Sequence, residues 1–216
     1  MSSGTEPWLK ICGITSPDDA RLAVDAGADA LGLNFVTTSK RWIDEPTAQA
    51  IADAVRGQVE LVGVVANETS ERLQSLAQAL GLDWLQLHGD EPPSALAPFA
   101  KAFKAVGVES SLDVARAATY PGERLLVDAK AQGASGGTGQ RFDWTLVREL
   151  AASRRLILAG GLTPDNVAAA VISVRPWGVD VASGVERAGE PRRKDPALVA
   201  RFIANARDAA SRFAGS

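Results

Sequence analysis

The sequence predicts a single α/β domain folded as a (β/α)8 barrel, also called a TIM barrel. Short apolar segments alternate with amphipathic segments along the chain, and strands that alternate with helices pair in parallel. We count eight strand–helix units, the number that closes a barrel without leaving an edge strand. Hairpin dipeptides such as Asn-Gly are absent. The 216 residues suit a compact barrel with few insertions, and an open doubly wound sheet is the main alternative.

The eight expected strands are short and apolar. They cover residues 8–11, 29–35, 59–66, 83–88, 102–106, 124–128, 156–159 and 178–182. The segment 59–66 is an almost continuous apolar run, as expected of a strand that is covered on both faces.

Helical patterns follow these strands. They cover residues 16–26, 45–56, 68–80, 112–118, 143–152, 163–171 and 196–210, and a further short helix is expected to begin at residues 91–93. Thr15 or Ser16 is expected to cap the first helix, with Pro17 in its first turn. Gly27 and Gly81 end two of the helices.

The composition excludes several classes of function. The net charge is −3 and no long basic run occurs, which argues against nucleic-acid and membrane-surface partners. No apolar run reaches membrane-spanning length. Residues 1–7 are polar and lack the apolar core of a signal peptide, so we expect a flexible lead before the barrel within one domain of residues 1–216.

The cysteine and histidine content gives two further expectations. A single Cys cannot form an internal disulfide, which is consistent with a reducing, cytoplasmic location. One His, one Cys and no metal-binding motif predict that the protein needs no metal, although a site made of carboxylates alone stays open. No dinucleotide or Walker motif occurs, so no cofactor is expected.

In a (β/α)8 barrel the active site lies at the C-terminal ends of the strands. The polar residues and glycines expected there come from distant parts of the sequence. They are Cys12, Asn34, Asn67, His88, Asp128, Gly160, Gly161, Ser183 and Gly184.

Cys12 and Asp128 are the candidate base and acid. Cys12 ends the first strand and Asp128 ends the sixth, so both side chains are expected at one mouth of the barrel. A thiol base needs nearby cationic or dipolar help to ionise, and a carboxylic acid needs desolvation or nearby negative charge to keep its proton. The alternatives are that Cys12 is a small core residue and that Asp128 caps a loop.

Glycine-rich segments follow the last three strands and predict a phosphate site. Gly136–Gly139 with Gly137 follows the sixth strand, Gly160 and Gly161 the seventh, and Ser183 and Gly184 the eighth. Backbone N–H groups can approach an anion closely at glycines, and the loops after strands seven and eight commonly hold phosphate in this fold. The alternative is that these glycines only form tight turns.

Two more side chains are candidates for binding the substrate. Arg41, in the loop after the second strand, is able to grip a carboxylate through two hydrogen bonds, or it is a solvated surface residue. His88, the only histidine, ends the fourth strand. It either shuttles a proton or lines the pocket, or it has a structural role.

Taken together, these segments resemble the phosphoribosylanthranilate isomerase family of tryptophan biosynthesis. The resemblance runs from Lys10 to the final helix and rests on ordered motifs. They are Lys10-Ile-Cys-Gly-Ile-Thr15, Leu31-Gly-Leu-Asn-Phe35 with Ser39 and Arg41, Leu85-Gln-Leu-His-Gly-Asp-Glu91, Leu126-Val-Asp-Ala129, Gly136-Gly-Thr-Gly139 with Phe142-Asp-Trp144, Leu158-Ala-Gly-Gly-Leu-Thr-Pro164 and Val181-Ala-Ser-Gly-Val-Glu186. The family commonly has proline where Lys40 stands here, which affects the substrate loop but not Arg41.

The resemblance implies an Amadori rearrangement of N-(5′-phosphoribosyl)anthranilate to the carboxyphenylamino-deoxyribulose phosphate. Cys12 would match the general base, Asp128 the general acid and Arg41 the residue that holds the anthranilate carboxylate. Backbone groups around Gly137, Gly161 and Ser183-Gly184 would hold the phosphate. No cofactor or metal is implied. Members are commonly monomers, with homodimers known, so we expect a monomer whose partner is a phosphoribosyl small molecule.

Two other functions compete with this one. The histidine-pathway isomerase catalyses a similar reaction on the same fold, but uses a carboxylate where Cys12 stands here. A non-catalytic phosphosugar-binding barrel explains the glycine loops, but gives no joint role to Cys12 and Asp128.

Overall fold

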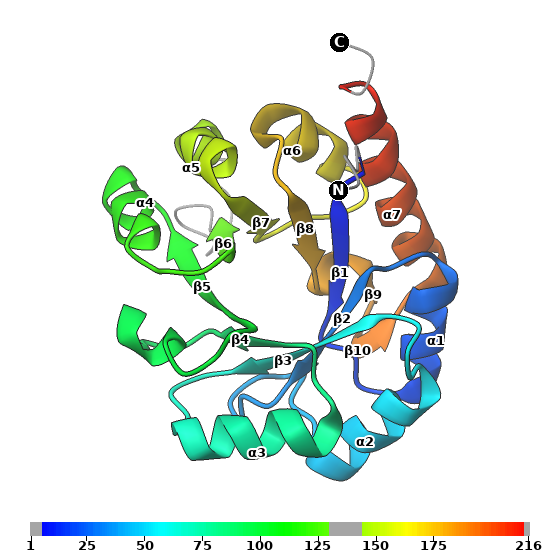
Figure 1. Ribbon diagram of the computed structural model, residues 1–216. Coiled ribbons are helices and arrows are strands. Elements are labelled where there is room, and N and C mark those ends of the chain that lie inside the picture. Colours follow the sequence, from blue (N-terminus) through cyan, green and yellow to red (C-terminus); the bar gives the residue numbers. More distant parts are fainter. Residues whose placement is uncertain (1–5, 130–143, 214–216) are drawn as a thin grey trace.

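Eight parallel strands form a closed barrel, in which each strand pairs with the next and β8 pairs with β1 (Figure 1). The structure is a computed structural model that describes residues 6–129 and 144–213. The strands are β1 (Trp8–Cys12), β2 (Ala30–Asn34), β3 (Glu60–Val65), β4 (Trp84–Leu87), β5 (Ala102–Val108), β6 (Arg124–Ala129), β7 (Arg155–Ala159) and β8 (Gly178–Val181). The predicted fold class is confirmed.

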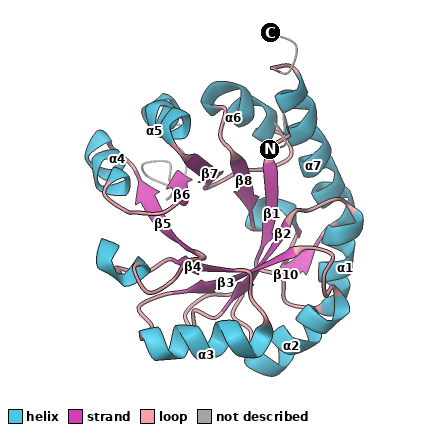
Figure 2. Cartoon of the chain, viewed as in Figure 1, coloured by secondary structure: helices cyan, strands magenta, loops and turns pink. Residues whose placement is uncertain are grey.

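Helices surround the strands on the outside of the barrel (Figure 2). They are α1 (Pro17–Asp25), α2 (Glu45–Ala54), α3 (Ser70–Leu80), α4 (Ser111–Ala118), α5 (Arg148–Ser153), α6 (Val167–Val174) and α7 (Pro196–Ser211), with short 3-10 turns at η1 (Pro93–Leu96), η2 (Trp144–Val147) and η3 (Ser183–Val185). Ser16 caps α1 by accepting a hydrogen bond from the Asp19 N–H at 3.2 Å, as expected for a cap followed by Pro17. Among the described residues, no helix is long and apolar enough to cross a membrane.

Alternation along each strand divides the core into two parts. In β1, Leu9 and Ile11 are fully buried in the cluster between strands and helices. Lys10 and Cys12 point the other way, into the barrel, because successive side chains of a strand face opposite sides. A second apolar cluster, which includes Phe103 and Leu126, fills the barrel interior. The polar face of β1 therefore lies inside the barrel.

A cationic plug closes the N-terminal end of the barrel. The guanidinium carbon of Arg124 lies 5.0, 3.8 and 4.7 Å from the ring centroids of Trp8, Trp84 and Trp177, respectively. Arg124 also donates two hydrogen bonds, of 2.9 and 3.1 Å, to the carboxylate of Glu60. This end of the barrel is thus filled with side chains, and open space remains at the opposite end.

Three helical segments differ from the prediction. The helix expected at 143–152 is the 3-10 turn η2 followed by α5, which begins only at Arg148. The helix expected at 163–171 begins only at Val167, because the Asn166 side chain accepts a hydrogen bond from the Thr163 N–H and donates one to the Gly161 carbonyl. These bonds hold the intervening residues in a turn. The short helix expected after β4 is only the 3-10 turn η1.

An antiparallel pair, β9 (Glu186–Arg187) and β10 (Glu190–Lys194), follows η3 and was not predicted. Its turn uses Gly189, whose φ of +76° favours glycine, in an Ala-Gly pair rather than an Asn-Gly pair. This hairpin lies beside the barrel mouth and returns Lys194 to the buried interior.

Candidate active site

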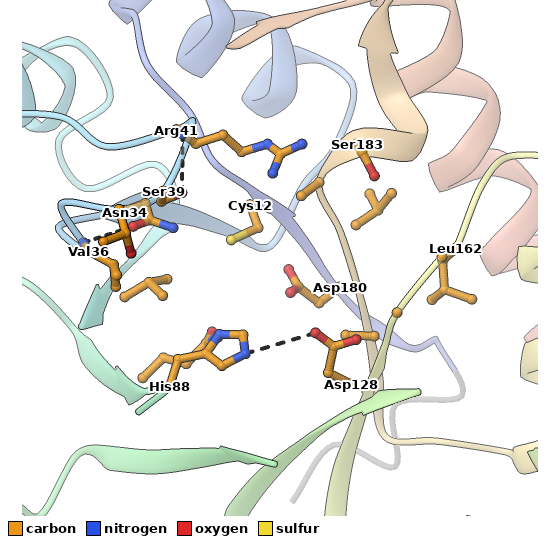
Figure 3. Close-up of a pocket in the computed structure, with 18 residues that line it drawn as sticks. Cys12, Asn34, Val36, Ser39, Arg41, His88, Asp128, Leu162, Asp180 and Ser183 are labelled. Carbon is orange, nitrogen blue, oxygen red and sulfur yellow. Dashed lines mark hydrogen bonds and ion pairs between the residues drawn. The ribbon is translucent and has the colours of Figure 1, made fainter. Parts of the chain in front are cut away.

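A cavity of about 420 Å³ opens at the C-terminal ends of the strands (Figure 3). Its walls come from seven of the eight strands and the loops that follow them. The lining residues are Cys12, Asn34, Val36, Thr38, Ser39, Arg41, Val64, Gln86, His88, Asp128, Ala159, Gly160, Gly161, Leu162, Asp180, Val181, Ala182 and Ser183.

Most of the predicted site residues meet in this cavity. They are Cys12, Asn34, Arg41, His88, Asp128, Gly160, Gly161 and Ser183. Gly184 does not line the cavity but packs against Leu162, and Gly137 lies outside the described residues. Asn67 does not line the cavity either, and its side chain accepts a hydrogen bond from the Asp90 N–H. In Figure 3, Cys12 lies near the centre of the cavity, with Arg41 above it and the pair formed by His88 and Asp128 below.

Cys12 is a free thiol at the end of β1, and 8% of the residue is exposed. Its register partner on β2 is Gly32, where an added Cβ would lie 2.7 Å from the Cys12 sulfur. The space that the sulfur occupies therefore depends on glycine at this position. Burial raises the pKa of Cys12, while the nearby cations Lys10 and Lys194 act in the opposite direction.

His88 faces Asp128 across the lower part of the cavity. The Nε2 of His88 lies 3.9 Å from the Oδ2 of Asp128, which is close enough for electrostatic attraction but too long for a hydrogen bond. Burial lowers the pKa of His88, although Asp128 acts in the opposite direction. The imidazole is therefore expected to be neutral near pH 7, where it can donate or accept a proton but adds no full charge.

Arg41 reaches the cavity, but one edge of its guanidinium is already engaged. Its Nε and Nη2 donate hydrogen bonds of 2.6 and 2.8 Å to the two carboxylate oxygens of Glu186 on β9. Although burial alone would raise the pKa of Glu186, its bonds to Arg41 and the charge of Lys194 lower this pKa overall. A substrate carboxylate would therefore meet the Nη1 side of Arg41.

The loops after β7 and β8 touch each other at the rim. Gly160 and Gly161 adopt φ values of +94° and +61°, which favour glycine. A Cβ added to Gly184 would lie 1.9 Å from the carbonyl oxygen of Leu162, so this contact requires glycine as well. The two loops therefore meet at one side of the cavity, and Gly160, Gly161 and Ser183 line it there.

Several ionisable residues of the site were missed by sequence reasoning. Lys10 and Asp180 form a buried ion pair of 2.9 Å beneath the cavity, and Lys194 lies 3.5 Å from Glu186. The available signal was a charged residue within an apolar strand, as for Lys10 in β1 and Asp180 in β8. Within the described parts of the chain, no three His, Cys, Asp or Glu side chains are grouped so that they could hold a metal ion.

The chain matches a known family over nearly its whole length. The family model for N-(5′-phosphoribosyl)anthranilate (PRA) isomerase matches residues 9–205. The N-(5′-phosphoribosyl)anthranilate isomerase of Desulforudis audaxviator is 48% identical over 204 residues, covering 93% of this chain and 98% of that protein. The corresponding isomerase of Roseiflexus castenholzii is 47% identical over 214 residues, covering 94% and 99%.

Solved structures agree with the sequence relatives. The crystal structure of phosphoribosyl anthranilate isomerase from Thermotoga maritima superimposes with a TM-score of 0.85 at 40% identity, covering 94% of this chain and 99% of that one. A phosphoribosyl anthranilate isomerase in complex with reduced 1-(o-carboxyphenylamino)-1-deoxyribulose 5-phosphate superimposes with a TM-score of 0.84 at 38% identity and the same coverage. These relatives share both the barrel and a sequence that aligns along almost its full length.

Proposed function

The chain belongs to the N-(5′-phosphoribosyl)anthranilate isomerase family, and from this we propose which residues carry the reaction. The protein is an aldose–ketose isomerase of tryptophan biosynthesis. We propose that Cys12 is the general base and Asp128 the general acid of an Amadori rearrangement. The observation that carries this proposal is the position of the two side chains on β1 and β6 in one cavity, beside the glycine loops that follow β7 and β8.

In the first proposed step Asp128 gives its proton to the ribose ring oxygen of the substrate. The C1′–O bond breaks, the lone pair of the anthranilate nitrogen forms a C1′–N double bond, and the iminium carries the positive charge. In the second step the thiolate of Cys12 takes the proton from C2′, and the C2′–H electron pair forms an enolamine. Tautomerisation of the enolamine gives the 2-keto product. General acid and base catalysis of this kind contributes about 10²–10⁴-fold in rate.

The phosphate end of the substrate is proposed to bind the glycine loops that follow β7 and β8. We propose that backbone N–H groups of Gly160, Gly161, Ser183 and Gly184 hold the phosphate, and Gly137 is proposed to help from outside the described residues. The φ values of Gly160 and Gly161 and the close contact at Gly184 support this part of the proposal.

Arg41 and His88 are proposed to serve the anthranilate end and the reaction centre, respectively. Arg41 would hold the anthranilate carboxylate through the guanidinium side that Glu186 leaves unengaged. His88 would border the ribose, because it lines the cavity opposite Asp128.

A fluorescence assay tests this proposal. Purified protein is mixed with N-(5′-phosphoribosyl)anthranilate, and loss of anthranilate fluorescence is followed for the wild type and for Asp128→Asn. The variant keeps the shape of the side chain but cannot give up a carboxylic proton, so its kcat is expected to fall about 10²–10⁴-fold. Wild-type kcat in this variant would move the acid role to another group.

Two comparisons complete the assay. Asp165→Asn is the matched control, because Asp165 forms an exposed ion pair with Arg201 and does not line the cavity. Its turnover is expected to equal that of the wild type. The histidine-pathway substrate is tested in parallel, because its turnover would indicate the related isomerase activity. If neither substrate is turned over, a non-catalytic phosphosugar-binding barrel is favoured.

We further propose that the protein acts in the cytoplasm and as a monomer, with a homodimer as the alternative. The single free cysteine suits a reducing compartment. Sedimentation velocity at micromolar concentration tests the oligomeric state, since a dimer would have twice the mass of 22.6 kDa.

A further inference from the structure

Cys12 is surrounded by buried and half-buried charges that do not balance one another. With Asp128 protonated, as its proposed role as the acid requires, the charges around Cys12 are three cations and two carboxylates, so the group carries one surplus positive charge. They are Lys10, Arg41, Asp180, Glu186 and Lys194. A thiolate at Cys12 would complete the balance. Removing charge from water is costly unless it is paired, so such a surplus favours a nearby anion.

Lys10 is the cation best placed to act on this sulfur. It is fully buried and sits two residues before Cys12 on the inward face of β1. A Cβ added to Gly32 would lie 2.7 Å from the Cys12 sulfur and 3.1 Å from the Lys10 Cε, so both groups border the same small space. Burial raises the pKa of Cys12, and the charge of Lys10 is the largest of the influences that lower it.

Asp180 fixes the position of the Lys10 ammonium. The two residues are register partners on β1 and β8, and the Lys10 Nζ donates a hydrogen bond of 2.9 Å to the Asp180 Oδ1. The long lysine side chain is therefore held in one conformation beneath the cavity, where it has no access to water. The Asp180 carboxylate lines the cavity, and in Figure 3 it appears between Cys12 and Asp128.

We propose that Lys10 is a positioning residue of the isomerase, whose ammonium, held by Asp180, stabilises the thiolate of Cys12 before it takes the substrate proton. This inference rests on the proposed role of Cys12 as the base. Lys10 does not line the cavity, and it acts on the substrate only through the sulfur of Cys12. Lys194 on β10 is a second buried cation that favours the thiolate of Cys12, and its Nζ donates a 3.0 Å hydrogen bond to the Ala182 carbonyl.

The sign of the effect follows from the charges that face the thiol. Burial raises the pKa of Cys12, Lys10 and Lys194 lower it, and Asp180 raises it. Arg41 and Glu186 approach from the rim as a pair, and the cavity wall opposite carries the weakly basic His88 with Asp128. Of the neighbouring charges, Lys10 has the largest influence on the thiol, so its removal is expected to make ionisation of Cys12 harder.

The test uses alkylation, because Cys12 is the only cysteine of the protein. The rate of modification by iodoacetamide is measured from about pH 6 to about pH 10 on the full chain, and only the thiolate reacts. In Lys10→Met the midpoint is expected to rise by about one unit or more, which makes alkylation about tenfold slower at a fixed pH below the midpoint. The rising limb of kcat/KM against pH is expected to shift by the same amount.

Lys104→Met is the matched control. Lys104 is 3% exposed and pairs with Glu91 at 3.0 Å, so this variant also breaks a buried lysine–carboxylate pair. Its ammonium donates hydrogen bonds to the carbonyls of Leu87, at the end of β4, and Gly89, and Lys104 does not line the cavity. The alkylation profile of Lys104→Met is therefore expected to coincide with that of the wild type, whatever its stability.

A second variant guards against misfolding of Lys10→Met, in which Asp180 would be buried without its partner. The double variant K10M/D180L replaces the pair by apolar residues, which is often neutral for stability. Lys10 influences the thiol more than Asp180 does, so the double variant is expected to lie between the wild type and Lys10→Met in its midpoint.

Two results would overturn the inference. One is a Lys10→Met or K10M/D180L midpoint equal to or below that of the wild type, and the other is a shift in Lys104→Met as large as in Lys10→Met. The proposed function fails by a different result, namely wild-type turnover when Cys12 is replaced. The alkylation profile does not depend on turnover, so the two failures are distinguishable.

Discussion

Arg124→Met is expected to destabilise the barrel without affecting the chemistry. Arg124 is buried at the N-terminal end, where it bonds both oxygens of Glu60 and contacts three tryptophan rings. Removing one partner of a buried ion pair costs about 3–5 kcal/mol. Glu60 is 34% exposed at its side chain, which favours the lower end of this range. Loss of the cation–π contacts adds about 1–2 kcal/mol, so we expect about 4–5 kcal/mol in total.

Urea unfolding measures this loss through the midpoint and the slope of the transition. Arg155→Met is the matched control, because Arg155 also contacts a tryptophan ring but pairs with Glu123 at an exposed position. Exposed pairs contribute about 0–1 kcal/mol, so this variant is expected to stay close to the wild type. If Arg124→Met loses no more stability than Arg155→Met, Arg124 does not stabilise the barrel as proposed. If kcat per folded molecule of Arg124→Met falls more than about tenfold, its effect is not confined to stability.

Three further predictions concern the cavity. Gly184→Ala places a Cβ 1.9 Å from the Leu162 carbonyl oxygen, so inhibition by inorganic phosphate is expected to weaken at least about tenfold. Gly107→Ala is the control, because open space surrounds its Cβ, and its inhibition constant should equal that of the wild type. An unchanged inhibition constant in Gly184→Ala would show that Gly184 is not part of the phosphate site. Arg41→Ala is expected to raise KM about 10–100-fold with little change in kcat, as for loss of a charge-assisted pair, and an unchanged KM in steady-state kinetics would contradict its role. Because burial raises the pKa of Cys12, kcat/KM is expected to rise with pH into the range above its ordinary value, and a profile already flat at neutral pH would argue against a thiol base.

The sequence predicted the barrel because its signals were local and repeated. Apolar strands, helix caps such as Ser16 and the count of eight units each pointed to the same fold. The fold in turn placed Cys12, His88 and Asp128 in one cavity, since the C-terminal ends of parallel strands meet at one face.

Pairings between distant residues could not be predicted in this way. The engagement of Arg41 by Glu186 depends on a hairpin whose Ala-Gly turn has no strong sequence signal. Lys10 and Asp180 are 170 positions apart, and their contact requires the closing register between β1 and β8. The start of α6 was misplaced because the side-chain bonds of Asn166 compete with the helix.

We propose that Cys12 and Asp128 together isomerise the phosphoribosyl substrate within the cavity at the C-terminal end of the barrel. The steady-state turnover of N-(5′-phosphoribosyl)anthranilate by Cys12→Ala tests this proposal. In this variant kcat is expected to fall about 10²–10⁴-fold, or about 3–5 kcal/mol in the barrier, while inhibition by inorganic phosphate is preserved. Near-normal turnover in Cys12→Ala would show that Cys12 is not the base.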